Sequence, residues 1–179
     1  MADPVTSANW VYRGLFAASA LAVIFVQILP FRIGDPSVPG PDLLPLLAFA
    51  WVLRRPDYVP VWLVALTMLF ADLMLMRPPG LWSALVVLGV EFLRSRVGLS
   101  RGLPVLVEWA MVALVLAGIT ALHAVILAVV MVEQPTVAQT ALHALTTIVA
   151  YPAVVLLSAA IYGVRKTAPG EVDALGHRL

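Results

Sequence analysis

The chain has 179 residues, of which 62% are hydrophobic and 12% charged, and its formal net charge is +1 at pH 7. A soluble domain contains roughly 45–50% apolar residues, so this composition predicts an integral membrane protein whose outward faces meet lipid. The near-neutral charge gives no support for nucleic-acid binding, and the absence of cysteine excludes disulfides and thiolate chemistry.

The prolines and arginines divide the chain into apolar segments, which we expect to form one all-α transmembrane domain covering residues 1–179. A bundle of six transmembrane helices is expected, with spans at about 11–29, 43–55, 59–76, 81–95, 103–132 and 137–164. The alternative for the first segment is a cleaved signal peptide. However, its apolar run is long for such a peptide, and no small-x-small cleavage site follows it.

The segment 43–55 is unusually short for a membrane span. Asp42 is expected as its N-cap and Pro56 as its end. The helix would be about 20 Å long, against a hydrocarbon core of about 30 Å. It is therefore either a re-entrant helix or a membrane span that is completed by its flanking residues. We favour a span, beside which the membrane is thinned or the helix is sheltered by its neighbours.

The last two segments are longer than the bilayer requires. Residues 103–132 and 137–164 both exceed the roughly 20 residues that cross a membrane. These helices must tilt, kink at Gly118 and Pro152, or project beyond the lipid.

We expect the hairpin at 129–140 to rise above the outer surface. Met131 and Val137 would then expose apolar side chains that could receive a partner. The alternative is that kinks in the two helices keep this hairpin among the lipid headgroups.

Basic residues set the expected orientation. An even number of crossings puts both termini on one side, and that side carries nine of the basic residues against two on the other. The excess predicts cytoplasmic termini, because cytoplasmic loops are enriched in Lys and Arg. The first group is Arg13, Arg54, Arg55, Arg94, Arg96, Arg101, Arg165, Lys166 and Arg178, and the second is Arg32 and Arg77.

Asp72 lies inside an otherwise apolar segment, where a carboxylate is costly unless it faces protein or water. It could make a structural contact, take part in ion or substrate movement, or bind a partner. Its depth differs from that of Glu91 by roughly 7–8 Å, which argues against a carboxylate pair. We expect Asp72 to fix the following turn by accepting hydrogen bonds from backbone N–H groups, Ser83 or Arg77.

Two further acids are expected near the cytoplasmic surface. Glu91 precedes Arg94 by three residues, which predicts a local ion pair. Glu108, early in its helix, has Arg101 and its neighbouring charges within reach, and a negative charge there also suits the helix dipole. We therefore interpret both acids as residues with structural roles at the membrane interface.

His123 and His143 fall in the outer halves of neighbouring helices and could meet. A metal site would need further ligands at the same depth, for which only Asp72 is a candidate, so we expect no metal and favour hydrogen bonds between helices. The sequence also lacks the common hydrolase, metalloprotease and nucleotide-binding motifs, so no catalytic residue or cofactor is expected.

Residues 41–96 carry a family resemblance. Pro41-Asp42 opens a short helix, Arg54-Arg55-Pro56 closes it, and Asp72-Leu73 is followed by Pro79-Gly80-Leu81. This pattern resembles the rod shape-determining protein MreD family, as do the chain length and the hydropathy. The match covers about a third of the chain, and Met74 and Met76 depart from the usual pattern.

The resemblance implies a non-enzymatic subunit of the bacterial elongation (rod) complex, in the inner membrane. Such a subunit binds MreC and acts with the RodA polymerase and its penicillin-binding transpeptidase, and indirectly with the MreB cytoskeleton. The family's fold is similar to that of the substrate-binding subunits of energy-coupling-factor transporters. The alternative function is therefore a small-molecule (vitamin-type) binding subunit, which should present a polar, aromatic-lined cavity toward the outside.

On either interpretation, certain residues are candidates for structural or partner-binding roles. They are Asp72, Arg77, Gly80, Arg54, Arg55, Glu91, Met131 and Val137.

Overall fold

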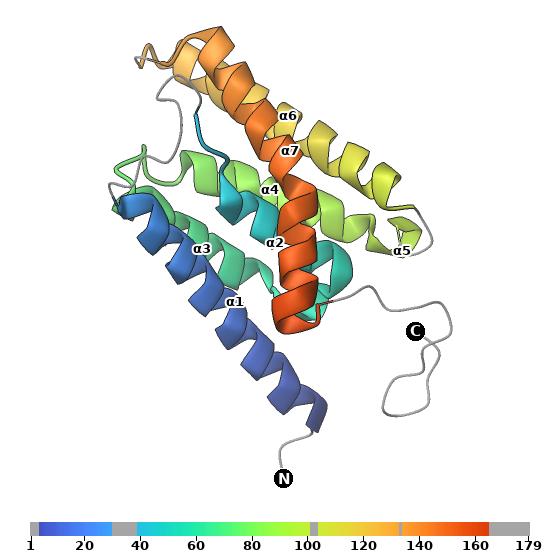
Figure 1. Ribbon diagram of the computed structural model, residues 1–179. Helices are drawn as coiled ribbons and strands as arrows, with labels where there is room; N and C mark the ends of the chain where they lie inside the picture. Colours follow the sequence, from blue (N-terminus) through green and yellow to red (C-terminus); the bar gives the residue numbers. More distant parts are fainter. Residues whose placement is uncertain (1–3, 30–38, 101–103, 133, 165–179) are drawn as a thin grey trace.

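The computed structural model describes residues 4–29, 39–100, 104–132 and 134–164, and every regular element among them is helical (Figure 1). The all-α prediction is therefore confirmed for the described part of the chain. The elements are α1 Pro4–Ile28, α2 Leu43–Arg54, the 3-10 helix η1 Pro56–Tyr58, α3 Val61–Met74, α4 Leu81–Ser95, α5 Val97–Ser100, α6 Val105–Val129 and α7 Val137–Tyr162.

Three of these helices are long and apolar enough to cross a membrane. They are α1 from Asn9 onward, α6 and α7, whereas α2 and α3 are apolar but shorter. The chain is therefore a membrane protein by the length and composition of its helices. The full set of six crossings remains a prediction.

The helix boundaries differ from the predicted spans in several places. The segment predicted at 59–76 forms the shorter helix Val61–Met74, because Pro60 is its N-cap and the 3-10 helix η1 ends just before it. The four-residue helix α5 was not predicted, and α7 runs through Pro152 without a break. By contrast, α4 has the predicted boundaries.

Helix α2 forms the centre of the bundle (Figure 1). Every residue from Leu44 to Arg54 is buried, and α2 packs against α7, α4 and α1. A helix with apolar residues on every side is stable where every side is buried, which explains the central position of α2. Ala48 and Ala50 are both 0% exposed, so the prediction that the short helix is sheltered by its neighbours is confirmed.

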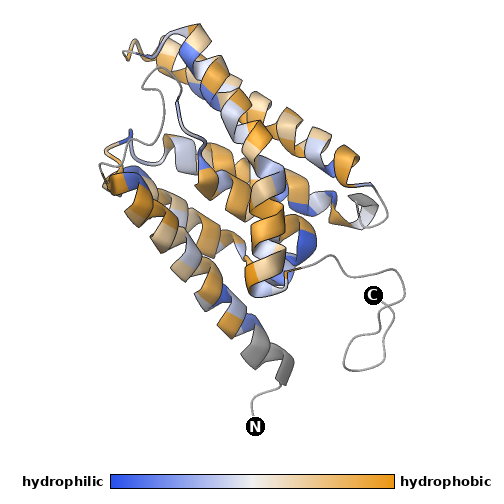
Figure 2. Ribbon diagram, viewed as in Figure 1, coloured by the Kyte–Doolittle hydropathy of each residue, from blue (hydrophilic) through white to orange (hydrophobic). Residues whose placement is uncertain are grey.

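Much of the ribbon of α1, α6 and α7 carries hydrophobic residues (Figure 2). Phe25 on α1, Leu114 on α6 and Leu156 on α7 are all more than half exposed. In water this surface would promote aggregation, whereas in lipid it needs no partner. The surface therefore agrees with a bilayer around α1, α6 and α7.

A glycine permits close packing between three helices. A Cβ atom added to Gly89 of α4 would lie 3.0 Å from Phe49 of α2 and 3.1 Å from Val115 of α6. Phe49 is fully buried in a close-packed interior, so moving its ring would disturb its neighbours. Gly89 thus allows α4 to approach α2 and α6 together.

Helices α3 and α6 end in the same way. Met76 and Met131 follow them with positive φ angles of 54° and 57°. In each case the next amide donates to a carbonyl of the last helical turn: Arg77 N to Asp72 O at 2.9 Å, and Val132 N to Leu127 O at 3.1 Å. This is the Schellman arrangement, in which glycine is the usual residue at the left-handed position.

The ion pair predicted between Glu91 and Arg94 is confirmed, with 2.8 Å between Oε1 and Nε. Arg94 also donates to the carbonyl oxygens of Pro56 at 3.0 Å and Val59 at 2.6 Å. Arg13 reaches η1 from α1. Arginines of α1 and α4 therefore gather at the end of the bundle where η1 lies, and the side of the membrane that this end faces stays a prediction.

Candidate functional site

Asp72 holds the turn between α3 and α4, as predicted. Its Oδ2 atom accepts hydrogen bonds from Gly80 N at 3.2 Å, Ser83 N at 3.2 Å and Ser83 Oγ at 2.6 Å. Gly80 has a φ of 91°, a conformation that side-chain-bearing residues rarely adopt. The carboxylate is 1% exposed, and N–H and O–H donors stabilise its charge.

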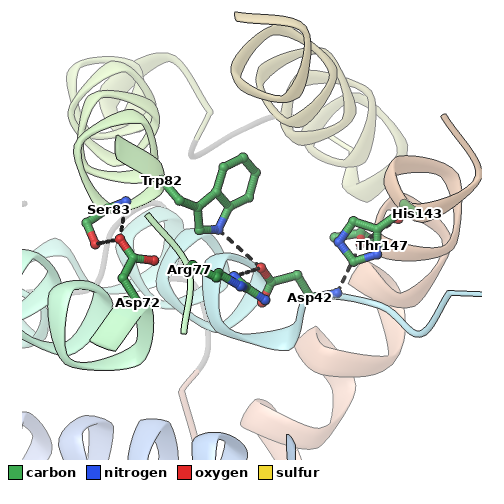
Figure 3. Close-up of polar contacts among 7 residues, drawn as sticks. All are labelled: Asp42, Asp72, Arg77, Trp82, Ser83, His143 and Thr147. Atoms are coloured by element: carbon green, nitrogen blue, oxygen red, sulfur yellow. Dashed lines mark hydrogen bonds and ion pairs between the residues drawn. The ribbon is translucent and has the colours of Figure 1, made fainter. Parts of the chain in front are cut away.

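Of the three kinds of donor expected for Asp72, the Arg77 side chain is the one that does not donate to it. Arg77 pairs instead with Asp42, with 2.9 Å between Nη1 and Oδ2. Trp82 Nε1 donates to the same oxygen at 3.1 Å, so Arg77 and Trp82 converge on Asp42 while Asp72 turns toward Ser83 (Figure 3). A buried carboxylate requires a counter-charge or several donors. Asp72 Oδ2 accepts three hydrogen bonds from neutral donors, whereas Asp42 Oδ2 has the arginine and one indole N–H.

Asp42 occupies the N-cap position of α2, as predicted, but its side chain makes no capping hydrogen bond. Its backbone N–H donates instead to Thr147 Oγ1 of α7 at 3.1 Å. Asp42 therefore connects the start of α2 with α7 through its backbone, and with the start of α4 through its carboxylate (Figure 3).

A cavity of about 720 Å³ lies beside this pair. We call it the Arg77 cavity. Trp82 lines it from α4, His123 from α6 and His143 from α7. Among the described residues, the cavity is lined by Pro39, Asp42, Met76, Arg77, Pro78, Trp82, Thr120, His123, Ala124, Leu127, Val132, Gln134, Pro135, Gln139, Thr140 and His143. The lining thus combines aromatic and polar groups with apolar ones.

The two histidines share this cavity. The ring of His123 packs edge-on against Trp82, with 5.2 Å between centroids and 76° between planes. His143 lies on α7 beside Thr147 (Figure 3). Within the described residues no hydrogen bond joins the two imidazoles, so the bridge between helices expected from the sequence is not formed directly.

A second polar centre lies at the other end of α2. Arg54 Nη1 is 2.8 Å from Glu108 Oε1, and the two side chains are 5% and 0% exposed. Tyr151 of α7 donates its hydroxyl to the same Glu108 oxygen at 2.5 Å. Glu108 was expected to meet Arg101 and its neighbouring charges near the membrane interface, and its pairing with Arg54 was not predicted. Both side chains face the inside of the bundle, where each neutralises the other.

The predicted contact between Glu108 and Arg101 cannot be compared with this geometry, because Arg101 lies outside the described residues. Arg54 Nη1 also donates to Ala50 O of its own helix at 3.0 Å. One turn of α2 thus holds the charged centre against α6 and α7.

The sequence reading missed the polar residues of α7. Thr147, Tyr151 and Ser158 are all buried, and Ser158 Oγ accepts a hydrogen bond from Trp51 Nε1 at 3.3 Å. Their spacing places them on one face of a helix, a signal that the sequence contains. This spacing would have identified the face of α7 that packs on α2.

The remaining candidates lie apart from these two centres. Arg55 is the half-buried C-cap of α2, and Glu91 pairs with Arg94 near η1. Met131 and Val137 are 92% and 87% exposed beside the turn between α6 and α7, so their predicted exposure is confirmed. Their position relative to a membrane stays a prediction.

Within the described residues, no group of three or more His, Asp or Glu side chains is placed to hold a metal ion. In comparisons with protein-family models, curated proteins and solved structures, nothing matched this chain.

Proposed function

We propose that the chain is a non-enzymatic subunit of the bacterial elongation (rod) complex in the inner membrane. It would bind an MreC-like protein and act with a RodA-type polymerase and its penicillin-binding transpeptidase, and indirectly with the MreB cytoskeleton. Its task would be to help couple that cytoskeleton to peptidoglycan synthesis and so maintain cell shape.

One observation carries this proposal. The residues behind the resemblance form the internal frame of the bundle: Asp42 and Arg54 hold the two ends of α2, and Asp72 with Gly80 fixes the turn between α3 and α4. Their charges serve hydrogen bonds and ion pairs between helices. Such a frame suits a membrane scaffold whose outer faces receive partners.

The proposal includes six membrane crossings with both termini in the cytoplasm. The start of α1 and the end of α7 lie toward the same end of the bundle (Figure 1). Reporter fusions after Arg101 and after Leu179 should both read cytoplasmic, and fusions within 32–41 and 133–136 should read external. An external C-terminus would refute this arrangement.

The exposed end of the α6–α7 hairpin is the proposed docking place for the MreC-like chain. Val130, Met131 and Val137 present apolar side chains there, and each is more than 60% exposed. Photo-crosslinkers at Met131 and Val137 should capture the MreC-like chain. Crosslinks to lipid alone, with capture from α1 to α4 instead, would show that it docks elsewhere.

Affinity capture from native membranes in mild detergent tests the function as a whole. Recovery of MreC-like and RodA-like chains is the expected result. Recovery of an ATPase module would support the second candidate, a small-molecule binding subunit of a transporter. The Arg77 cavity favours that candidate, because it has the polar and aromatic lining such a subunit needs.

A further inference from the structure

The Arg77 cavity has the dimensions and lining of a small-molecule site. Its volume of about 720 Å³ falls within the range of about 300–1,000 Å³ that is typical of ligand pockets. Three helices and the segment before α2 contribute to its wall. A bound molecule would thus touch parts of the chain that are distant in sequence.

Arg77 lines this cavity and has one edge of its guanidinium unused. It contacts Asp42 through Nη1, and its Nε and Nη2 atoms have no partner among the described residues. Its side chain is 32% exposed. The Nε–Nη2 edge of a guanidinium is planar and presents two parallel N–H groups, which match the two oxygens of a carboxylate.

The guanidinium is also held in place. The Asp42 carboxylate that fixes it is 2% exposed, and the Trp82 indole donates to the same oxygen. The second hydrogen bond spreads the negative charge of Asp42, which weakens its repulsion of a further anion. An arginine oriented by a buried partner loses less side-chain entropy when it binds a ligand.

The rest of the cavity indicates what the carboxylate is attached to. The Trp82 and His123 rings form one wall, and Ala124 and Leu127 continue it along α6 with apolar surface. The imidazole of His143 adds a hydrogen-bonding group from α7. An apolar or aromatic body would fill this part while its carboxylate reaches Arg77.

We propose that the Arg77 cavity binds a small organic carboxylate with an apolar or aromatic body, anchored by the Nε–Nη2 edge of Arg77. This inference is independent of the rod-complex proposal, since it concerns the cavity wall and needs no partner protein. A rod-complex subunit and a transporter subunit could each contain such a site.

The test is calorimetric titration of the full chain in lipid nanodiscs with 4-phenylbutyrate and with its uncharged analogue 4-phenylbutyramide. The carboxylate should bind roughly tenfold or more tightly than the amide, because only the carboxylate makes charge-assisted hydrogen bonds. Equal affinity for the two compounds, or binding of neither, would overturn the proposal. Equally strong binding of inorganic phosphate would overturn the assignment to carboxylates.

Two variants assign the binding to this cavity. Arg77→Lys keeps a cation beside Asp42 but removes the bidentate edge, so affinity for 4-phenylbutyrate should fall roughly tenfold while the unfolding midpoint changes little. Leu127→Trp should block the cavity without touching either ion pair. If the lysine variant does not fold, loss of 4-phenylbutyrate binding in Leu127→Trp still assigns the binding to this cavity. Unchanged affinity in the folded variants would show that the compound binds elsewhere.

Discussion

The two ends of helix α2 each carry an arginine–carboxylate pair, and the pairs differ in their surroundings. Arg54 and Glu108 are 5% and 0% exposed and share a hydrogen-bond network with Tyr151. Arg77 and Asp42 are 32% and 2% exposed and border a cavity. One pair is enclosed by the bundle, and the other leaves part of its arginine open.

The difference shows how the same chemistry can serve two purposes. An enclosed ion pair fixes which helices meet, because either charge alone would be very costly there. In the open pair, the acid orients the arginine and leaves its second edge available. Burial of the arginine, rather than of the acid, separates the two cases.

The largest expected effect is at the enclosed pair. Glu108→Gln leaves the Arg54 charge inside the bundle without its counter-ion, which should lower the free energy of unfolding by about 3–5 kcal/mol. Denaturant unfolding in detergent measures this change. Glu91→Gln is the matched control, because it breaks an ion pair whose side chains are 25% and 43% exposed, and it should cost no more than about 1 kcal/mol. Equal effects of the two changes would contradict the enclosed environment of Glu108.

Asp72 adds a third carboxylate, stabilised by N–H and O–H groups alone. Asp72→Leu should lower the free energy of unfolding by about 2–3 kcal/mol, since the amide groups of Gly80 and Ser83 lose their acceptor. Asp72→Asn keeps an acceptor oxygen and should cost about 1 kcal/mol. Membrane accumulation and thermal unfolding measure both variants. Equal accumulation of the two with loss of partner capture would instead assign Asp72 to an interaction surface.

The open pair should be less sensitive than the enclosed one. Arg77→Gln should lower the free energy of unfolding by about 1–2 kcal/mol, because water reaches the arginine and Trp82 still donates to Asp42. The same unfolding assay compares it with Glu108→Gln. A loss as large as that of the Glu108 variant would remove the distinction between the two pairs.

The smallest effect is expected at the turn beside the open pair. Met76→Gly should raise the free energy of unfolding by about 0.5–1 kcal/mol, because Met76 adopts a φ of 54° that favours glycine. Met76 is 93% exposed, so little packing is lost. Met131→Gly is the matched variant at the end of α6 and should behave alike. Destabilisation by both would show that the methionine side chains make contacts that matter more than the backbone conformation.

Much of the fold could be predicted from sequence, because apolar segments and prolines mark helices directly. The boundaries of α4, the shelter of α2 and the role of Asp72 with Ser83 all followed from local patterns. Asp72 and Ser83 are close in sequence and joined by a short turn, so their contact needed no knowledge of the bundle.

The ion pairs of α2 could not be predicted in the same way. Arg54 and Glu108 are 54 residues apart, and Arg77 and Asp42 are 35 apart. Their pairing depends on how helices turn about their axes once packed. Arg54 ends an apolar helix, as interfacial arginines do, so nothing local distinguishes its buried state. The cavity likewise exists only where α4, α6 and α7 come together.

Cysteine accessibility tests the contrast between the enclosed and open regions most directly, because the chain has no cysteine of its own. Ala124→Cys places a thiol in the Arg77 cavity, and Ala48→Cys places one in the centre of α2. A small, charged, water-soluble thiol reagent should modify the first in the folded protein and the second only after unfolding. Equal modification of both in the folded protein, or protection of Ala124→Cys, would contradict the account.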